Sequence, residues 1–300
     1  MILRQCYLKM GKMKNCFILS SNAEHFLPAL KGAVLPGTNR EGKRYFPDGE
    51  IYVKLPEVKK MKGKRVIVVH SGLPRPNDGL IELELILEIL KEHKIKPEVF
   101  FTYFPYGRQD EVFEEGETNA AKAIVQKLRD YYRVKKIYAI DCHFGKKNWV
   151  KKITIFENVS AVPFLMKRAR RDWGKDILFL ATDQGGQRRF NLPGFDKKRK
   201  NSFQVEVFLP EPLAEKIKGK SVCLVDDLIG TGTTLLKIGQ LVKKYGAKKL
   251  LCLAVHGTLP KGVKKVKKKF DKIYLTNTIN NPGISQIDIT PLVLKAIGKT

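Results

Sequence analysis

The stretch from Ser221 to Leu235, SVCLVDDLIGTGTTL, carries the residue types and the spacing best suited to chemistry. It begins with a short apolar run of the kind that a parallel sheet buries on both faces. Two carboxylates, Asp226 and Asp227, follow that run, and open α/β sheets bind their ligands at the carboxyl ends of their strands. A turn rich in glycine and threonine and the expected start of a helix complete the stretch.

This turn predicts an anion-binding site. Its glycines permit tight backbone with positive φ, its threonines add hydroxyl donors, and the helix that follows directs its unpaired N–H groups and its dipole toward the loop. Two acids beside a phosphate site suit the vicinal hydroxyls of a ribose. The expected ribose-phosphate ligands are Asp226, Asp227, Gly230, Thr231, Gly232, Thr233 and Thr234. The alternative is an ordinary strand-to-helix turn with a capped helix. A Walker loop is excluded, because no G-x-x-x-x-G-K-[ST] occurs.

Further motifs place polar side chains at strand ends or in turns elsewhere in the chain. In chain order they are Phe46, Asp48 and Glu50 in FPDGE, Arg108, Gln109 and Asp110 in YFPYGRQD, His143 in IDCH, Asp183 in TDQGG, and the basic run from Asp196 to Lys200. Taken alone, a single histidine is more often structural, a basic run is more often a solvated loop, and FPDGE is an ordinary surface turn. Their order along one chain favours a common site.

Apolar strand-like runs alternate with helical patterns along the chain, which predicts parallel βαβ units. We therefore expect an α/β protein of two similar doubly wound domains with mainly parallel sheets. Residues 1–14 are expected to be an N-terminal extension, residues 15–156 an N-terminal α/β domain, and residues 157–300 a C-terminal α/β domain.

Several local expectations follow from the same patterns. A short helix is expected at residues 23–30, and an alternating strand at residues 51–55 after an exposed turn. Asn77 and Asp78 are expected to cap a helix at residues 79–92. The basic run near residues 196–202 is expected to lie in a polar loop.

Composition restricts the possible classes of protein. The chain has 300 residues, of which 43% are hydrophobic, so it can form real cores. Its five cysteines show no C-x-x-C pair and no disulfide spacing, which is typical of reduced residues in a cytoplasmic protein. The sequence predicts neither a membrane span nor a signal peptide. The net charge of +27 suggests nucleic-acid binding, but the lysines are dispersed and no nucleic-acid motif accompanies them, so a solvated basic surface is expected instead.

The five motifs FPDGE, PNDGLIEL, YFPYGRQD, IDCH with TDQGG, and VDDLIGTGTT resemble, in that order, those of ribose-phosphate pyrophosphokinases (PRPP synthases). The resemblance runs from Asn15 to the end of the chain, and the spacing after GRQD is similar to that of archaeal-type members. It implies transfer of the pyrophosphoryl group of ATP to the 1-hydroxyl of ribose 5-phosphate, giving PRPP and AMP. It also implies Mg²⁺ bound with the nucleotide, a cytoplasmic location and a homo-oligomer built from dimers. The resemblance leaves open whether this oligomer is a dimer, a tetramer or a hexamer.

The resemblance also implies roles for individual residues. Phe46, Asp48 and Glu50 would contact the ATP of a neighbouring subunit, and Arg108, Gln109 and Asp110 would hold ATP within the same subunit. His143 would act in catalysis and, with Asp183, would bind or orient the metal. Lys197 and Arg199 would close over the transferring group, with Lys198 and Lys200 as the alternatives if the register slips by one.

The chain departs from the family pattern at two places. Gly230 stands where the family usually has Asp or Ser, and Glu111, Val112 and Glu114 stand where basic residues are usual. Two other functions are therefore weighed: a catalytically silent regulatory subunit of the same family, and a phosphoribosyltransferase that uses the same ribose-phosphate loop. A nucleic-acid binder is a more distant alternative.

Overall fold

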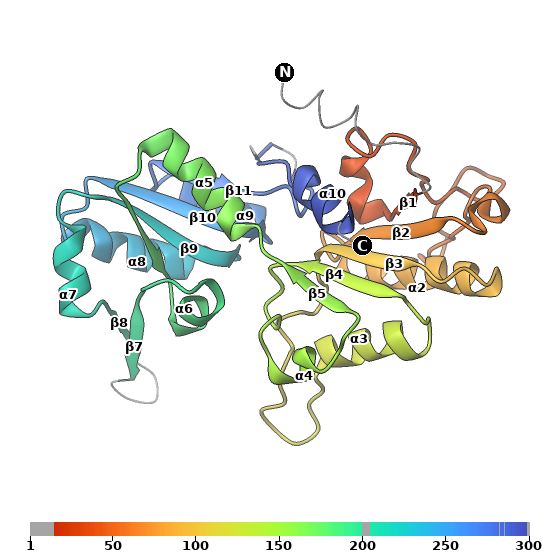
Figure 1. Ribbon diagram of the computed structural model, residues 1–300, viewed down its shortest axis with the longest axis horizontal. Helices are drawn as coiled ribbons and strands as arrows, with labels where there is room; N and C mark the ends of the chain where they lie inside the picture. The colour runs from red at the N-terminus through yellow and green to blue at the C-terminus, as the bar shows by residue number, and fades with distance from the viewer. Residues whose placement is uncertain (1–14, 200–204, 282, 285, 299–300) are drawn as a thin grey trace.

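The computed structural model describes residues 15–199, 205–281, 283–284 and 286–298. The described chain forms two parallel β-sheets with helices packed on them, and the two sheets lie side by side along the long axis of the molecule (Figure 1). This confirms the predicted α/β class with two mainly parallel sheets.

The first sheet has five parallel strands in the order of the chain. They are β1 (Asn15–Leu19), β2 (Arg65–Ser71), β3 (Glu98–Tyr103), β4 (Lys136–Ile140) and β5 (Phe156–Val159). Strand β5 crosses the predicted domain boundary between residues 156 and 157, because it pairs with β4. The division of the chain into domains stays a prediction, and this pairing favours a boundary after Val159.

The second sheet has four parallel strands in the order β11-β10-β9-β6. They are β6 (Ile177–Ala181), β9 (Ser221–Ile229), β10 (Lys249–Gly257) and β11 (Lys272–Leu275). Strands β9 and β10 are the longest, and their central residues are fully buried. The apolar run before the two acids therefore forms the buried first half of a central strand, as its composition predicts.

Helices cover both faces of each sheet (Figure 1). One face of the first sheet packs on α2 (Pro76–Glu92), α3 (Ala120–Asp130) and the short α4 (Asn148–Lys151). One face of the second sheet packs on α8 (Thr233–Lys244) and α9 (Pro260–Lys267). The elements α6 (Gln184–Phe190), α7 (Glu211–Ala214), η2 (Val58–Met61) and η3 (Glu215–Ile217) complete the loops.

One hydrophobic core joins the two halves of the molecule. It contains side chains from β1, β2 and β4 of the first sheet and from β9 and β10 of the second, together with α5 (Val162–Trp173) and α10 (Thr290–Gly298). The last helix belongs to the C-terminal half in sequence, yet Arg65 of β2 donates a hydrogen bond of 2.9 Å to the carbonyl of Ile297 at its end. This shared core fixes the carboxyl ends of both sheets relative to one another.

The expected basic loop at residues 196–202 is wrong in part, because its first residues form a strand. Strand β7 (Asp196–Arg199) pairs antiparallel with β8 (Val205–Phe208), so the segment is a β-hairpin. Lys200 lies outside the described residues.

Two expectations near the N-terminus are corrected by proline. The helix expected at residues 23–30 is a 3₁₀ helix, η1 (Ser21–Phe26), and it ends before Pro28, whose ring lacks the N–H that would continue the helical hydrogen bonds. Helix α2 begins at Pro76, and neither Asn77 nor Asp78 caps it. Proline suits the first helical position because the N–H it lacks would have no partner there.

The strand expected at residues 51–55 is also wrong. That segment makes only isolated bridges, Tyr45 with Ile51 and Gly37 with Lys54. Val53 and Leu55 nevertheless pack against the core of the first sheet. The alternation of apolar residues therefore reflects a loop that is buried on one side. A β-strand paired in a sheet would give the same alternation, so the sequence pattern cannot distinguish the two.

A buried histidine connects the two sheets. His256 of β10 lies with its Nε2 3.1 Å from the carbonyl oxygen of Ile140 in β4, and its Nδ1 lies 2.9 Å from Thr278 Oγ1. Burial lowers the pKa of His256 to about 4, well below its ordinary value of 6.5. The folded state therefore holds this imidazole neutral at neutral pH.

Acidification should weaken the fold through this histidine. Because its pKa is lower in the folded chain than in the unfolded chain, the stabilisation is complete above about pH 6.5 and is lost as the pH falls toward 4. We expect His256 to contribute up to ~1.4 kcal/mol per pH unit to the pH dependence of the unfolding free energy in that window. Urea denaturation at pH 7.5 and pH 5 should show a smaller difference for His256→Gln than for the unsubstituted chain. Equal differences in the two proteins would contradict this assignment.

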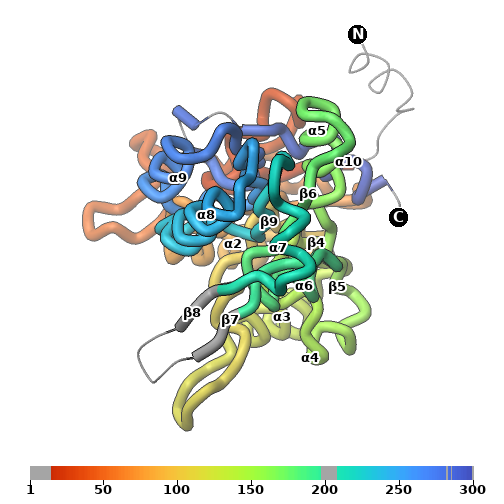
Figure 2. The backbone as a smooth tube through the Cα atoms, turned by 90° about the vertical axis from the view of Figure 1, so that its left-hand side faces the viewer, coloured from red at the N-terminus to blue at the C-terminus, as the bar shows by residue number. Residues whose placement is uncertain are grey.

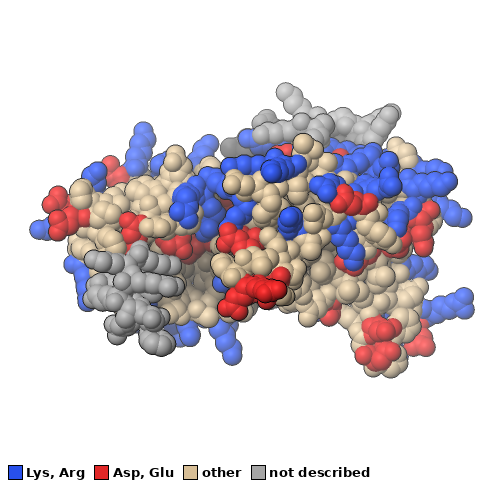
Figure 3. Space-filling model, turned by 90° about the horizontal axis from the view of Figure 1, so that it is seen from below, with Lys and Arg blue, Asp and Glu red and all other residues tan. Residues whose placement is uncertain are grey.

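Lys and Arg outnumber Asp and Glu by 57 to 30 in the sequence, and many of these basic side chains lie on the face shown in Figure 3. Among the described residues, no helix combines the length and the apolar character needed to cross a membrane.

Candidate functional site

The carboxyl ends of both sheets face one cavity of about 480 Å³. Its polar lining comes from both halves of the chain. From the first half come Tyr103, Arg108 and His143, and from the second come Asp183, Arg189, Asp226, Asp227, Thr258 and the loop from Gly230 to Thr234. Of the residues singled out in the sequence, Arg108, His143, Asp183 and the β9–α8 segment lie together on this cavity, and their roles stay a prediction.

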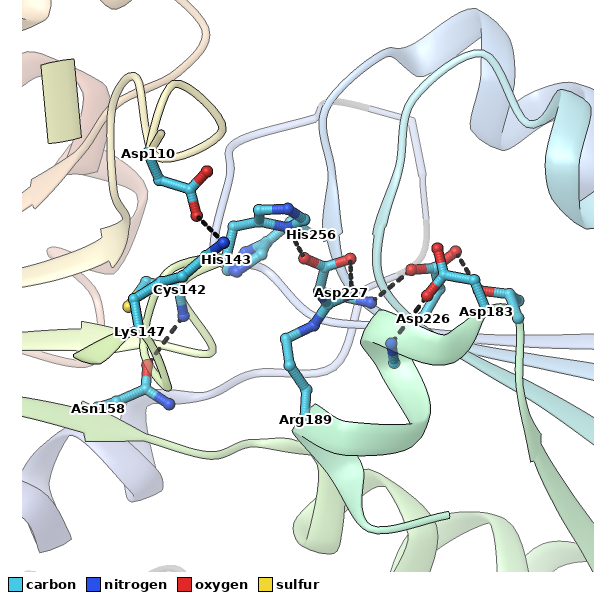
Figure 4. A network of polar contacts seen from close by, with 12 residues as sticks. Asp110, Cys142, His143, Lys147, Asn158, Asp183, Arg189, Asp226, Asp227 and His256 are labelled. Carbon is cyan, nitrogen blue, oxygen red and sulfur yellow. Dashed lines mark hydrogen bonds and ion pairs between the residues drawn. The ribbon is translucent and has the colours of Figure 1, made fainter. Parts of the chain in front are cut away.

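Asp227 is the centre of this lining (Figure 4). The Nδ1–H of His143, just beyond β4, donates to Asp227 Oδ2 at 2.8 Å. The Nη2 of Arg189, on α6, donates to Asp227 Oδ1 at 3.3 Å. One buried carboxylate thus orients an imidazole from the first half of the chain and a guanidinium from the second.

The two neighbouring acids have opposite electrostatic environments. Burial alone would raise the pKa of Asp227, but the hydrogen bond from His143 and the positive charge of Arg189 outweigh burial and lower it. Burial, and after it the charge of Asp227, raise the pKa of Asp226 well above its usual range. Asp226 accepts hydrogen bonds of 2.9 Å from Thr182 Oγ1 and from the backbone N–H of Asp227. Asp227 is therefore the anion of the pair.

The acids do not follow the end of β9, as the sequence suggests, but lie within it. Strand β6 ends its pairing where Ala181 meets Val225, whereas the pairing of β9 with β10 continues to Ile229 and Gly257. The sheet loses one strand at this point, and the acids lie where the neighbouring strand has stopped. The site is therefore at an edge that the shorter β6 exposes.

The β9–α8 loop has the geometry of an anion site. Gly232 has a φ of 79° directly before α8, and only a long contact of 3.5 Å from the Thr233 N–H to Thr231 Oγ1 reaches the start of that helix among the described residues. The first N–H groups of the helix, from Thr233 onward, thus lack intrahelical acceptors and line the cavity. Gly230 does not adopt positive φ, contrary to expectation, and a Cβ there would meet only ordinary van der Waals contacts. Glycine is needed for the backbone at Gly232 and not at Gly230.

Helix α9 holds this loop by direct backbone packing. A Cβ on Gly262 would lie 1.8 Å from the carbonyl oxygen of Gly230 and 2.8 Å from the carbonyl carbon of Thr231. Only glycine permits this approach, so Gly262 fixes the loop from behind. The sequence analysis did not identify this residue, since the contact joins segments far apart in the chain.

Replacing Gly262 by alanine should therefore displace the loop. The backbone atoms of Gly230 cannot yield like a flexible side chain, and overpacking of this kind costs about 1–3 kcal/mol. We expect weaker phosphate binding at the loop, about tenfold or more, measured by isothermal titration with ribose 5-phosphate. Gly298→Ala, at a helical position with nothing within 4 Å, is the matched control. Unchanged affinity in Gly262→Ala would show that the loop does not depend on this contact.

Arg189 is a second functional candidate that sequence reasoning missed. Its side chain passes over Gly185, where a Cβ would lie 3.1 Å from Arg189 Nη1. Its Nε is buried and has no hydrogen-bond partner in the described part of the chain. The sequence signal that could have identified Arg189 is its i, i+4 spacing from Gly185, which places both residues on one face of the helix that follows Asp183. Asp183 itself caps that helix, because its Oδ1 accepts a hydrogen bond of 2.8 Å from the N–H of Gly186.

The residues of the GRQD motif divide between two environments. Arg108 lines the cavity, whereas Gln109 and Asp110 are not among its lining residues. Asp110 is buried, and its carboxylate lies 3.8 Å from Lys147 Nζ (Figure 4). Lys147 also forms an ion pair with Glu111. The unusual acid after GRQD therefore has a local partner on the loop that follows β4.

The FPDGE motif lies away from the cavity. It forms an exposed turn, which is closed by a hydrogen bond of 2.8 Å from the N–H of Phe46 to the carbonyl oxygen of Glu50. The N–H of Glu50 also donates a hydrogen bond of 3.2 Å to Asp48 Oδ1. None of Phe46, Asp48 and Glu50 lines the cavity of the same chain. Their expected contact with ATP stays a prediction that requires a second subunit.

The β7–β8 hairpin projects from the second half on the same side of the molecule as the loop between β3 and α3 (Figures 1 and 2). Lys197 and Arg199 occupy alternate positions of β7, paired with Val207 and Val205, and Lys198 lies between them. The catalytic role expected for Lys197 and Arg199 stays a prediction.

Metal binding by protein groups alone has little support in the site. The described residues contain no group of three or more His, Cys, Asp or Glu side chains that could hold an ion. Figure 4 shows Asp227 between His143 and Asp183. Carboxylate oxygens at the edge of a cavity suit Mg²⁺ when phosphate oxygens and waters supply most of its ligands, which is the usual way this ion binds with nucleotides. The residues present fit that second arrangement.

Comparison with known proteins gives matches along most of the chain. Residues 37–131 match the family described as the N-terminal domain of ribose phosphate pyrophosphokinase, and residues 158–287 match the phosphoribosyl transferase domain. A ribose-phosphate pyrophosphokinase of Thermococcus kodakarensis is 33% identical over 294 residues, covering 93% of this chain and 99% of the relative. One of Pyrococcus furiosus is 32% identical over 295 residues, with 93% and 99% covered.

The fold has a counterpart among solved structures. The crystal structure of phosphoribosylpyrophosphate synthetase from Mycobacterium smegmatis superposes with a TM-score of 0.74 at 21% identity, covering 94% of this chain and 98% of that one.

Proposed function

The chain belongs to the ribose-phosphate pyrophosphokinase family, and from that premise we propose that it transfers the pyrophosphoryl group of ATP to the 1-hydroxyl of ribose 5-phosphate, giving PRPP and AMP. The observation that supports this most is the single cavity in which an anion-binding helix start, two acids and cationic side chains from both halves converge. In the reaction the 1-hydroxyl oxygen bonds to the β-phosphorus, the bond from that phosphorus to the α-phosphate oxygen breaks, and the hydroxyl proton is lost.

Ribose 5-phosphate is proposed to occupy the β9–α8 side of the cavity. The N–H groups at the start of α8 and the hydroxyls of Thr231, Thr233 and Thr234 would receive the 5-phosphate. Asp226 and Asp227 would accept the vicinal hydroxyls of the ribose. Gly230 leaves out the side-chain contact that is usual in the family, so the backbone carries more of the binding here.

The triphosphate of ATP is proposed to enter from the side of the first sheet. Arg108 and Arg189 both reach the cavity, and the buried Nε–H of Arg189 has no hydrogen-bond partner among the residues that the structure describes. Cationic donors in a confined cavity stabilise the charge that develops during phosphoryl transfer, where positioning and electrostatics do most of the catalysis. His143, held through its Nδ1 by Asp227, keeps its Nε2 edge for the nucleotide.

Lys197 and Arg199 are proposed to complete the cationic surroundings from the β7–β8 hairpin, with Lys198 and Lys200 as the alternative pair. Phe46, Asp48 and Glu50 are proposed to contact the adenine in a neighbouring subunit, and Gln109 and Asp110 are proposed to bind ATP together with Arg108. When bound, Mg²⁺ would neutralise the negative charge of the phosphates, and Asp183 and His143 are the protein groups proposed to hold the Mg–nucleotide.

A cytoplasmic homo-oligomer built from dimers completes the proposal. The described cysteines, Cys16, Cys142, Cys223 and Cys252, are all free, which supports a reducing compartment. The exposed FPDGE turn, separate from the cavity of its own chain, supports a contribution to a neighbouring subunit.

Release of AMP from ATP in the presence of Mg²⁺ and ribose 5-phosphate tests the proposed activity. We expect AMP and PRPP to form in equal amounts, and only when both substrates are present. A chain that binds both substrates but forms no AMP over a range of Mg²⁺ and phosphate concentrations would instead be a silent regulatory subunit. Pyrophosphate release from PRPP and a nucleobase would favour a phosphoribosyltransferase.

A further inference from the structure

A groove with an apolar floor and a rim of lysines lies between the outer surfaces of α8 and α9, and the catalytic site does not use it. Its volume is about 600 Å³. Leu236, Gly239, Leu250 and Phe270 line its floor, and its rim is formed by Lys243, Lys244, Lys265, Lys268 and Lys269. The lysine-rich segment that the sequence analysis attributed to a solvated surface thus borders a defined hollow.

The lysine rim has little counter-charge of its own. Lys243 lies 3.5 Å from Asp271. Lys244, Lys265, Lys268 and Lys269 have no ion pair with any residue in the part of the chain that the structure describes. A ring of unneutralised cations around an apolar floor favours an occupant that is both acidic and apolar.

The same chain carries a segment of that composition on another surface. The loop from Glu111 to Glu117, EVFEEGE, contains four glutamates. Phe113 is 80% exposed and Val112 is 56% exposed, which makes Phe113 the most exposed large hydrophobic residue in the described part of the chain. Acidic side chains gather near the middle of the lower face in Figure 3, toward which this loop projects.

This loop is ordered by its own hydrogen bonds. Glu117 Oε2 accepts from the backbone N–H of Phe113 at 2.7 Å and from that of Glu114 at 3.2 Å, and Glu117 N–H donates to the carbonyl of Glu114 at 3.2 Å. Lys147 fixes its first residue, Glu111. A loop held in one shape can present an exposed aromatic ring without a large loss of conformational entropy on binding.

We propose that the loop from Glu111 to Glu117 of one copy docks into the α8–α9 groove of a second copy of this chain. Phe113 and Val112 would cover the apolar floor, and the glutamates beside them would face the lysine rim. Within one copy the two surfaces belong to different halves of the molecule, and no hydrogen bond or ion pair joins them among the described residues. The interaction is independent of the proposed activity.

Such a contact is heterologous, because it joins two different surfaces. It leaves one loop and one groove free at the ends of every assembly, so it extends a chain of copies or closes a ring. The contact is small and strongly charged, so we expect weak association that salt suppresses. It would add to any dimer formed through another surface.

Mixing two defective variants tests this geometry directly. The loop variant Phe113→Ser/Glu115→Lys keeps an intact groove, and the groove variant Lys265→Glu/Lys268→Glu keeps an intact loop. In sedimentation equilibrium at low salt, the weight-average mass of the unsubstituted chain should rise with concentration, and that of each variant alone should stay at its basal value. A mixture of the two variants should recover a rise that stops at pairs, because the intact loop of one variant can still meet the intact groove of the other.

Matched controls separate docking from a general charge effect. Lys261→Glu/Lys264→Glu makes the same change of charge on the same helix outside the groove, and Phe164→Ser removes a different exposed aromatic side chain. Both should associate like the unsubstituted chain. If the loop and groove variants also associate normally, or if their mixture fails to recover the rise, the proposal is wrong. Circular dichroism confirms that each variant is folded.

Discussion

Replacing Lys197 and Arg199 together by alanine should lower kcat for AMP formation by about 10³-fold or more, while the KM for ribose 5-phosphate changes little. The reason is electrostatic. The transferring group carries several negative charges in a loose transition state, and cations that meet it only at that stage affect the rate and not the binding of the sugar. The strand pairing of β7 with β8 places these two residues at alternate positions.

The position between them supplies the control for this experiment. Lys198→Ala removes one positive charge from the same strand but from the intervening position, so we expect less than a tenfold loss of kcat. Steady-state AMP release and the thermal unfolding midpoint should be measured for all variants. A full loss of turnover in Lys198→Ala with normal turnover in the double variant would assign the catalytic pair to Lys198 and Lys200.

Asp227→Asn should lower kcat/KM for ribose 5-phosphate by about 10²–10³-fold, because one substitution disrupts three interactions. The amide is neutral and keeps only one oxygen as an acceptor, so the imidazole of His143 and the partly buried guanidinium of Arg189 lose their shared counter-charge and one of them loses its acceptor. A ribose hydroxyl loses a charged acceptor as well. Removal of one partner from a buried ion pair typically costs about 3–5 kcal/mol in stability.

A control variant separates the effect of substituting Asp227 from the effect of removing any carboxylate. Asp130→Asn breaks an exposed ion pair with Arg129 and should change neither kcat/KM nor the unfolding free energy by a measurable amount. The affinity of Asp227→Asn for ribose 5-phosphate should be measured by calorimetry beside its kinetics. Normal affinity and normal kcat would contradict the central place that the structure gives to this carboxylate.

The strands of the two sheets are predictable from the sequence, because buried parallel strands leave apolar runs such as RVIVVH and VCLV. Residues 51–55 show the limit of that signal. Their apolar alternation is real, and Val53 and Leu55 pack on the core, but their backbone meets only single residues of the same loop. Whether a partner strand exists is a long-range property that periodicity does not report.

The candidate site follows a similar division. Asp226, Asp227, His143, Asp183 and Arg108 stand at or near strand ends, where parallel sheets bring separate segments together, so their convergence is predictable. Arg189 and Gly262 are not predictable in this way. Arg189 matters because α6 turns it over Gly185 toward Asp227, and Gly262 matters because α9 meets the β9–α8 loop backbone to backbone. Both roles depend on how helices pack after the sheets have formed.

The account depends most on where the sugar phosphate binds. A crystal structure of the protein with ribose 5-phosphate and a non-hydrolysable analogue of ATP tests this directly. We predict that the 5-phosphate accepts hydrogen bonds from the N–H groups at the start of α8, that the ribose hydroxyls contact Asp226 and Asp227, and that the β-phosphate lies between Arg108 and Arg189. Sugar phosphate bound anywhere else, with the β9–α8 loop empty, would contradict the proposed function and its mechanism.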